Sequence, residues 1–294
     1  MIGYLFVLIS SLSGAAKGYL GKTISAKTPS YRSSVFVNIV RMLLCVVISL
    51  LAEVIECGSV RFQLDLPAML YGILAGVAMS VFVVSWLLCI QRGAFMLVSV
   101  AQMFGVIVTL ILSFVVFRES VTPRQLLGVG LLTVAVLCMI SYSAKIKGKL
   151  TVTSVLLLLT CGVSSGLLDF SQKLFTAFSQ SSVSTLNLLT YVAGAVFLIL
   201  CFAVSKPQAD LDCKVLLKET FVALVLMSVC LFANSYFKAF ATKFLTAAQI
   251  YPVYQSIGLI LSATMSAVFF KERLTRRSVL GIVLAFTALI FINM

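Results

Sequence analysis

The chain has 294 residues, of which 61% are hydrophobic and 11% are Asp, Glu, Lys or Arg. A soluble domain carries about 45–50% apolar and about 25% charged residues, so this composition excludes an ordinary soluble enzyme. The net charge of +13 comes from Lys and Arg residues that lie mostly in short clusters between apolar runs. Such clusters are typical of membrane loops and not of a nucleic-acid-binding face. We therefore expect an integral membrane protein with no nucleic-acid partner.

The apolar runs predict ten membrane-spanning helices, since about 20 apolar residues cross the hydrocarbon core of a bilayer. The first two runs, 2–21 and 33–52, each contain one basic residue, Lys17 and Arg41. The other eight contain no charged residue and cover 66–91, 93–117, 125–144, 150–168, 174–205, 220–237, 244–270 and 278–294. The sequence thus predicts an all-α membrane protein with short loops and no soluble domain.

An internal repeat relates the two halves of the chain. A shift of 153 positions aligns residues 94–140 with 247–293 without a gap, with 15 identities in 47 positions. The best-matching part sets FRESVTPRQLLGVGLL, from Phe117, against FKERLTRRSVLGIVLA, from Phe270. Each half holds five helices, an odd number, so the second half must be inverted in the membrane. Inverted repeats are typical of secondary transporters, whose binding site lies near the midplane between the halves.

Ten helices, two five-helix halves and the F-[RK]-E-x-[VL]-T element near the end of each half resemble the drug/metabolite transporter superfamily, and specifically its EamA-like branch. The resemblance implies two EamA-like repeats, 1–148 and 149–294. It also implies a secondary transporter of small metabolites, with a cavity lined mainly by helices 1, 3, 4, 6, 8 and 9. Helices 5 and 10 would then serve as scaffold or as the contacts of a homodimer. The substrate stays open, because members of this superfamily carry amino acids, nucleotide sugars, choline-like cations and drugs.

Charged residues inside a membrane are costly and are candidates for function. Lys17 and Arg41 lie toward the loop between the first two helices, with no intramembrane acid nearby. Because Arg41 is too deep for comfortable snorkelling, it is the predicted main anion-binding group, assisted by Lys17. The alternative is that helix-end carbonyls or lipid headgroups hold Arg41.

A second group of charges lies toward the other side of the membrane. Asp169, Lys173, Lys238 and Asn234 are expected to share one vestibule, because helices 6 and 8 end on the same side. Asp169 and Lys173 form an i,i+4 pair, which is either a structural ion pair or a site that couples transport to an ion. Inversion is expected to keep Lys17 and Asp169 apart, although the two residues occupy nearly equivalent repeat positions.

Polar and aromatic residues complete the predicted substrate-binding set. Gln102 and Gln255 occupy matching repeat positions on helices 4 and 9, where they bind either each other or a ligand. Tyr251 and Tyr254 precede Gln255 on helix 9, and Trp86 on helix 3 is either an interfacial anchor or a cavity wall. The sequence contains no His, and its eight cysteines form no metal-like cluster, so we expect no catalytic residues, no metal and no cofactor.

These residues favour a transporter of a small metabolite that carries a carboxylate or phosphate, such as an amino acid or organic anion. The first alternative is an exporter of organic cations that uses Trp86, Tyr251 and Tyr254 as an aromatic cage. The second is a non-transporting membrane enzyme or lipid-handling subunit. Membrane lipid and a small-molecule substrate are the expected partners, and a bacterial plasma membrane is the expected location.

The distribution of basic residues predicts an orientation. The odd-numbered loops hold 14 Lys and Arg and the even-numbered loops hold six, which favours cytoplasmic odd loops and both termini outside. The family resemblance favours cytoplasmic termini instead.

Overall fold

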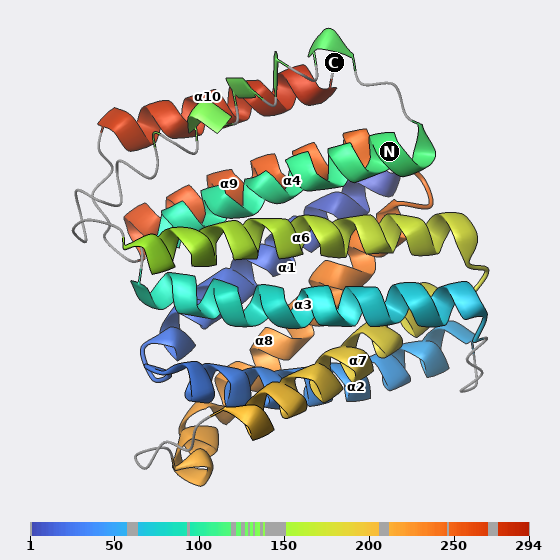
Figure 1. Cartoon of the computed structure of the whole chain (residues 1–294), viewed down its shortest axis with the longest axis vertical. Coiled ribbons are helices and arrows are strands. Elements are labelled where there is room, and N and C mark those ends of the chain that lie inside the picture. Colours follow the sequence, from blue (N-terminus) through green and yellow to red (C-terminus); the bar gives the residue numbers. More distant parts are fainter. Residues whose placement is uncertain are drawn as a thin grey trace.

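The computed structural model describes residues 2–57, 64–92, 95–118, 151–205, 212–245, 247–269 and 276–293, together with individual residues between 122 and 138. The described residues form long helices joined by short connections (Figure 1). Their bounds are α1 Ile2–Ser25, α2 Tyr31–Cys57, α3 Leu66–Arg92, α4 Phe95–Phe117, α6 Val152–Phe178, α7 Val183–Val204, α8 Cys213–Ala241, α9 Ala247–Val268 and α10 Arg276–Asn293.

The predicted all-α membrane fold is confirmed. Among the described residues, five helices are long and apolar enough to cross a membrane, judged by length and composition: α2, α3, α6, α7 and α8. The described residues between 123 and 138, where the fifth span is predicted, are helical. The acidic residues of the two F-x-E-x-x-T elements, Glu119 and Glu272, lie outside the described residues.

Several helices are longer than the charge-free runs that predicted them. The run 150–168 becomes α6, which continues through Asp169 and Lys173 to Phe178. Asp169 therefore lies nine residues before the end of α6, and Lys17 lies eight residues before the end of α1. Both residues therefore lie further from their helix ends than the predicted runs 2–21 and 150–168 would place them. A buried charge need not end a membrane helix when protein groups surround it, so charge alone marks the helix end too early.

The two halves are inverted relative to each other. Helices α2 and α7 are repeat equivalents and pack side by side with opposite directions. Near the start of α2, Arg32 donates a 2.5 Å hydrogen bond to the carbonyl oxygen of Ser205, which follows the end of α7. Near the end of α2, Glu53 accepts a 2.8 Å bond from the Ser182 hydroxyl, just before α7 begins.

The packing of the helices follows the same two-fold relationship. Exchanging α1 with α6, α2 with α7, α3 with α8 and α4 with α9 converts each main helix contact into another one that is present. The pair α1–α8 becomes α6–α3, α1–α9 becomes α6–α4, and α2–α8 becomes α7–α3. In Figure 1, α2 and α7 lie along one edge of the bundle, α10 lies along the opposite edge, and α1, α3, α6 and α8 lie between them. The centre of the bundle is therefore where the two repeats meet.

Candidate functional site

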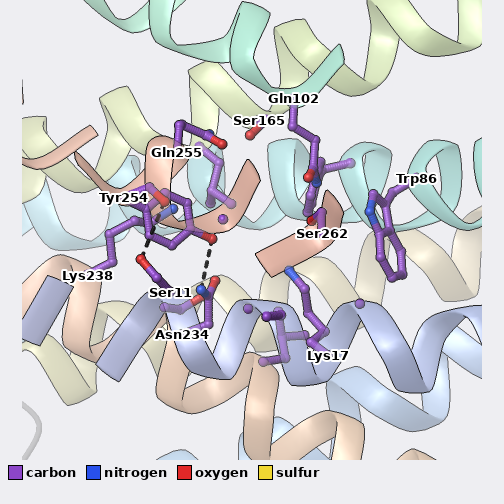
Figure 2. A pocket seen from close by; sticks show the side chains of 18 of the residues that line it. Ser11, Lys17, Trp86, Gln102, Ser165, Asn234, Lys238, Tyr254, Gln255 and Ser262 are labelled. Atoms are coloured by element: carbon purple, nitrogen blue, oxygen red, sulfur yellow. Dashed lines mark hydrogen bonds between the residues drawn. The ribbon is translucent and has the colours of Figure 1, made fainter. Parts of the chain in front are cut away.

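A cavity lies at the centre of the bundle, where the two repeats meet. It is lined by α1, α3, α4, α6, α8 and α9, the six helices that the family resemblance implies. Figure 2 shows its polar wall. The polar and aromatic lining residues are Ser11, Lys17, Phe82, Trp86, Gln102, Ser165, Asn234, Ser235, Lys238, Tyr254, Gln255 and Ser262.

Most of the predicted substrate-binding residues line this cavity. They are Lys17, Trp86, Gln102, Asn234, Lys238, Tyr254 and Gln255. Two predicted residues lie outside its lining. Tyr251 is 1% exposed, and its hydroxyl donates a 2.6 Å hydrogen bond to the main-chain oxygen of Asp169. Arg41 is also 1% exposed and lies behind the wall, against Met227.

Lys17 brings a positive charge to the cavity. Its ammonium lies 5.4 Å from the centre of the Phe82 ring and 5.6 Å from that of Trp86. Figure 2 shows this side chain rising from α1 into the space below Ser262. Within the described part of the chain, no carboxylate pairs with Lys17. An ammonium without a counter-charge in a membrane-embedded cavity is a ready partner for an anion.

Lys238 brings a second ammonium to the same cavity, but this one is paired. It donates a short hydrogen bond to one carboxylate oxygen of Asp169 and lies 5.0 Å from the centre of the Tyr254 ring. The other carboxylate oxygen of Asp169 is buried and accepts no hydrogen bond from the described residues. Lys173, the sequence-predicted partner of Asp169, places its ammonium 4.4 Å from the centre of the Phe117 ring.

The two lysines were expected to lie toward opposite sides of the membrane, and the structure places them in one cavity. Helices α1 and α8 are antiparallel, because Ser10 bonds to Asn234 near one end of the pair and Lys27 pairs with Glu219 near the other. Lys17 lies eight residues before the end of α1 and Lys238 lies in the last turn of α8, and both residues line the same cavity.

Asn234 ties together three helices of the cavity wall. Its amide nitrogen donates to the Ser10 main-chain oxygen at 2.8 Å and to the Tyr254 hydroxyl at 2.9 Å. The Ser10 hydroxyl donates back to the main-chain oxygen of Asn234 at 2.7 Å. In this conformation the network links α1, α8 and α9, and the cavity lies beside it.

The packing of α4 on α6 differs from that of its repeat equivalent, α9 on α1. Gly105 and Gly166 meet backbone to backbone, because a Cβ built on Gly166 would lie 2.4 Å from the Gly105 carbonyl oxygen. The repeat equivalent of Gly105 is Gly258, and a Cβ built there would meet no atom of the described residues within 4 Å. Gly258 of α9 and Gly14 of α1 line the cavity instead. The helices α4 and α6 are thus in close contact at this level, whereas α9 and α1 are separated there by the cavity.

Comparison with known proteins identifies the family. The model of the EamA-like transporter family matches residues 1–141 and 152–294. The chain belongs to this family. A crystal structure of another protein aligns with 96% of this EamA-like chain and 95% of its own, with a TM-score of 0.65 and 12% identity, which supports the shared fold. No curated protein matches the chain.

The EamA-like cavity also contains four serines that were not among the predicted binding residues: Ser11, Ser165, Ser235 and Ser262. A serine in a membrane helix usually bonds to the carbonyl one turn earlier, as Ser228 does with Leu224 at 2.8 Å. The position of a serine in the sequence therefore does not show whether its hydroxyl faces the cavity or only bonds to its own helix. Helical spacing gives one usable signal, since Gln255, Gly258 and Ser262 repeat at intervals of three and four residues on the cavity face of α9.

Proposed function

We propose that this EamA-like protein is a secondary, alternating-access transporter that carries a small polar metabolite bearing a carboxylate or phosphate. The observation that carries the proposal is the ammonium of Lys17, which lines the central cavity without a carboxylate partner among the described residues. Lys17 and Lys238 bring two positive charges to the cavity and Asp169 neutralises one of them. The remaining charge supports binding of an anionic group.

The rest of the wall suits a small metabolite with further hydrogen-bonding groups. Amide side chains of Gln102, Asn234 and Gln255 and the hydroxyl of Tyr254 provide donors and acceptors. Trp86 and Phe82 provide apolar surface beside the charge. An amino acid or an organic anion fits this combination of one charge, several polar groups and two aromatic rings.

The contacts of the aromatic residues argue against the alternative of an organic cation. An aromatic cage attracts a cation through exposed ring faces. Here the protein's own ammoniums lie beside the rings, since Lys17 is 5.6 Å from the centre of the Trp86 ring and Lys238 is 5.0 Å from that of Tyr254. Tyr251, the third proposed member of the cage, is buried with its hydroxyl bonded to the Asp169 backbone.

Alternating access is supported by the inverted halves and by the unequal packing of equivalent helix pairs. If the two repeats exchange conformations, α4 and α6 separate while α1 and α9 close, and the cavity opens on the other side. The basic loops and the ten-helix fold suit a bacterial plasma membrane, where we place the protein.

A counterflow assay with the purified protein in liposomes tests the proposed cargo. Vesicles loaded with L-glutamate, succinate, inorganic phosphate, choline or tetraethylammonium are mixed with the same labelled compound outside. We expect counterflow of at least one anion and of neither cation, and we expect Lys17→Gln to reduce it at least about tenfold by removing the charge. Lys27→Gln, at an exposed pair with Glu219, is the matched control and stays near wild type. Counterflow of choline and of none of the anions would contradict the proposal.

A further inference from the structure

Arg41 carries a buried charge that the described part of the chain does not neutralise. It lies within α2 and is 1% exposed. One terminal nitrogen, Nη1, lies 3.5 Å from the sulfur of Met227, and a thioether is a weak acceptor. Among the described residues, Nε and Nη2 have no hydrogen-bond partner and no carboxylate pairs with Arg41. Because an unpaired buried charge is costly, its retention calls for a ligand.

The two unbonded nitrogens indicate the chemistry of that ligand. Nε and Nη2 form one edge of the planar guanidinium, on which two N–H bonds point in parallel. This edge binds both oxygens of a carboxylate or phosphate at once, in the bidentate arrangement that favours Arg over Lys. The edge that lacks a partner among the described residues is therefore the edge suited to an anionic group.

Two side chains separate Arg41 from the cavity. A Cβ built on Gly21 would lie 2.2 Å from the outer edge of the Trp86 ring and 3.3 Å from the methyl group of Met227. The Trp86 ring and the Met227 side chain thus come together over Gly21. Trp86 lines the cavity on one side of this contact, and Met227 touches Arg41 on the other. An anion beside Lys17 and Trp86 would be one layer of side chains away from the guanidinium.

We propose that Arg41 is a second anion-binding position on the transport path, which takes the carboxylate or phosphate of the cargo from Lys17 when Trp86 and Met227 swing aside. Methionine, with three rotatable side-chain bonds, suits a movable partition. Lys17 binds the cargo in the conformation described above, and Arg41 binds it in a later one. This inference rests on the proposed anionic cargo.

The test separates binding at Lys17 from passage through Arg41. Trp86 is the single tryptophan of the chain, so its fluorescence reports binding of L-glutamate, succinate or inorganic phosphate in the purified protein. We expect Arg41→Gln to keep the fluorescence response of the wild type while counterflow of the responding anion falls at least about tenfold. We expect Arg41→Lys to reduce counterflow as well, because a lysine ammonium cannot make the bidentate hydrogen bonds of the guanidinium edge.

Arg32→Gln is the matched control on the same helix. Arg32 bonds to the backbone of Ser205 and lies 4.2 Å from the centre of the Phe202 ring, and it does not line the cavity. We therefore expect counterflow by the Arg32→Gln variant to stay near that of the wild type. Near-normal counterflow by Arg41→Gln would overturn the inference and leave the proposed function intact. Failure of both Arg41 variants to fold, as seen by size-exclusion chromatography, would also overturn it, because Arg41 would then be structural. Absence of any anion response or counterflow in the wild type would overturn both proposals.

Discussion

Gly105 of α4 and Gly166 of α6 are in backbone contact, and the hydroxyl of Thr109 donates a 3.0 Å hydrogen bond to the Gly166 carbonyl across the same interface. The repeat equivalent of Thr109 is Ser262, which lines the cavity. Gly258 and Ser262 on α9 line the cavity together with Gly14 on α1, and a Cβ built on Gly14 would meet the side chains of Asn234 and Tyr254. The α4–α6 pair is therefore closely packed, and the corresponding α9–α1 pair is open to the cavity.

The first prediction concerns the closed contact. In Gly166→Ala, the new methyl group would lie 2.4 Å from the Gly105 oxygen and 2.7 Å from the Val108 Cβ. We expect a loss of stability of about 1–3 kcal/mol, typical of overpacking, seen as earlier thermal unfolding in detergent. Gly130→Ala, where a Cβ meets no atom of the described residues within 4 Å, is the control. An unchanged unfolding temperature for Gly166→Ala would show that the two backbones are not in contact.

Gly258→Ala should behave differently. Its added Cβ meets nothing within 4 Å in this conformation, so we expect thermal unfolding to stay near wild type. When α1 and α9 close, the same methyl group would meet the backbone of Gly14, and we expect transport in the counterflow assay to slow markedly. Wild-type transport by Gly258→Ala would contradict the exchange of conformations between the repeats.

Periodicity and composition predicted nearly all of the fold, because a bilayer requires long apolar helices and an odd helix count inverts the second half. They left open whether Trp86 is an interfacial anchor or a cavity wall, and the structure places it in the cavity lining. The partner of Asp169 was not predictable in this way. The i,i+4 spacing pointed to Lys173, whereas Lys238, 69 residues away, makes the contact. Long-range pairing depends on how α6 and α8 pack, and a single sequence contains no local signal for that packing.

The buried pair of Asp169 and Lys238 gives a third prediction. Asp169→Asn leaves the Lys238 ammonium buried without a counter-charge, which typically costs about 3–5 kcal/mol. The double variant Asp169→Asn/Lys238→Gln removes both charges and should recover most of that loss in thermal unfolding. Glu219→Gln breaks the exposed pair with Lys27, whose side chains are 47% and 54% exposed, and should cost less than about 1 kcal/mol. A double variant no more stable than Asp169→Asn would argue against direct pairing.

Asp65, which precedes α3, gives a pH dependence outside the membrane. Partial burial raises its pKa, but hydrogen bonds from the backbone of Ala68 and Gln180 and from the hydroxyls of Ser179 and Ser181 outweigh this and lower the pKa below the usual 3.8. Its contribution to stability is therefore fully present above pH 3.8 and is lost as the pH falls through the lowered pKa.

The variant Asp65→Asn should remove that part of the acid dependence. Thermal unfolding of the wild type and Asp65→Asn, followed from neutral pH to below pH 3.8, is expected to converge at the acid end. If the unfolding temperatures of the two proteins differed by the same amount at every pH in this range, the loss of stability would not come from the charge of Asp65.

The central claim is that the cavity binds an anion beside Lys17, and the single tryptophan tests it most directly. The Lys17 ammonium lies 5.6 Å from the centre of the Trp86 ring, so an anion at Lys17 must change the surroundings of Trp86. Titration of the purified protein with L-glutamate, succinate, inorganic phosphate and choline, at constant ionic strength, measures this through Trp86 fluorescence. We predict a saturable response to at least one of the anions, none to choline, and loss of the response in Lys17→Gln. A saturable response to choline, unchanged in Lys17→Gln and absent for every anion, would contradict the account.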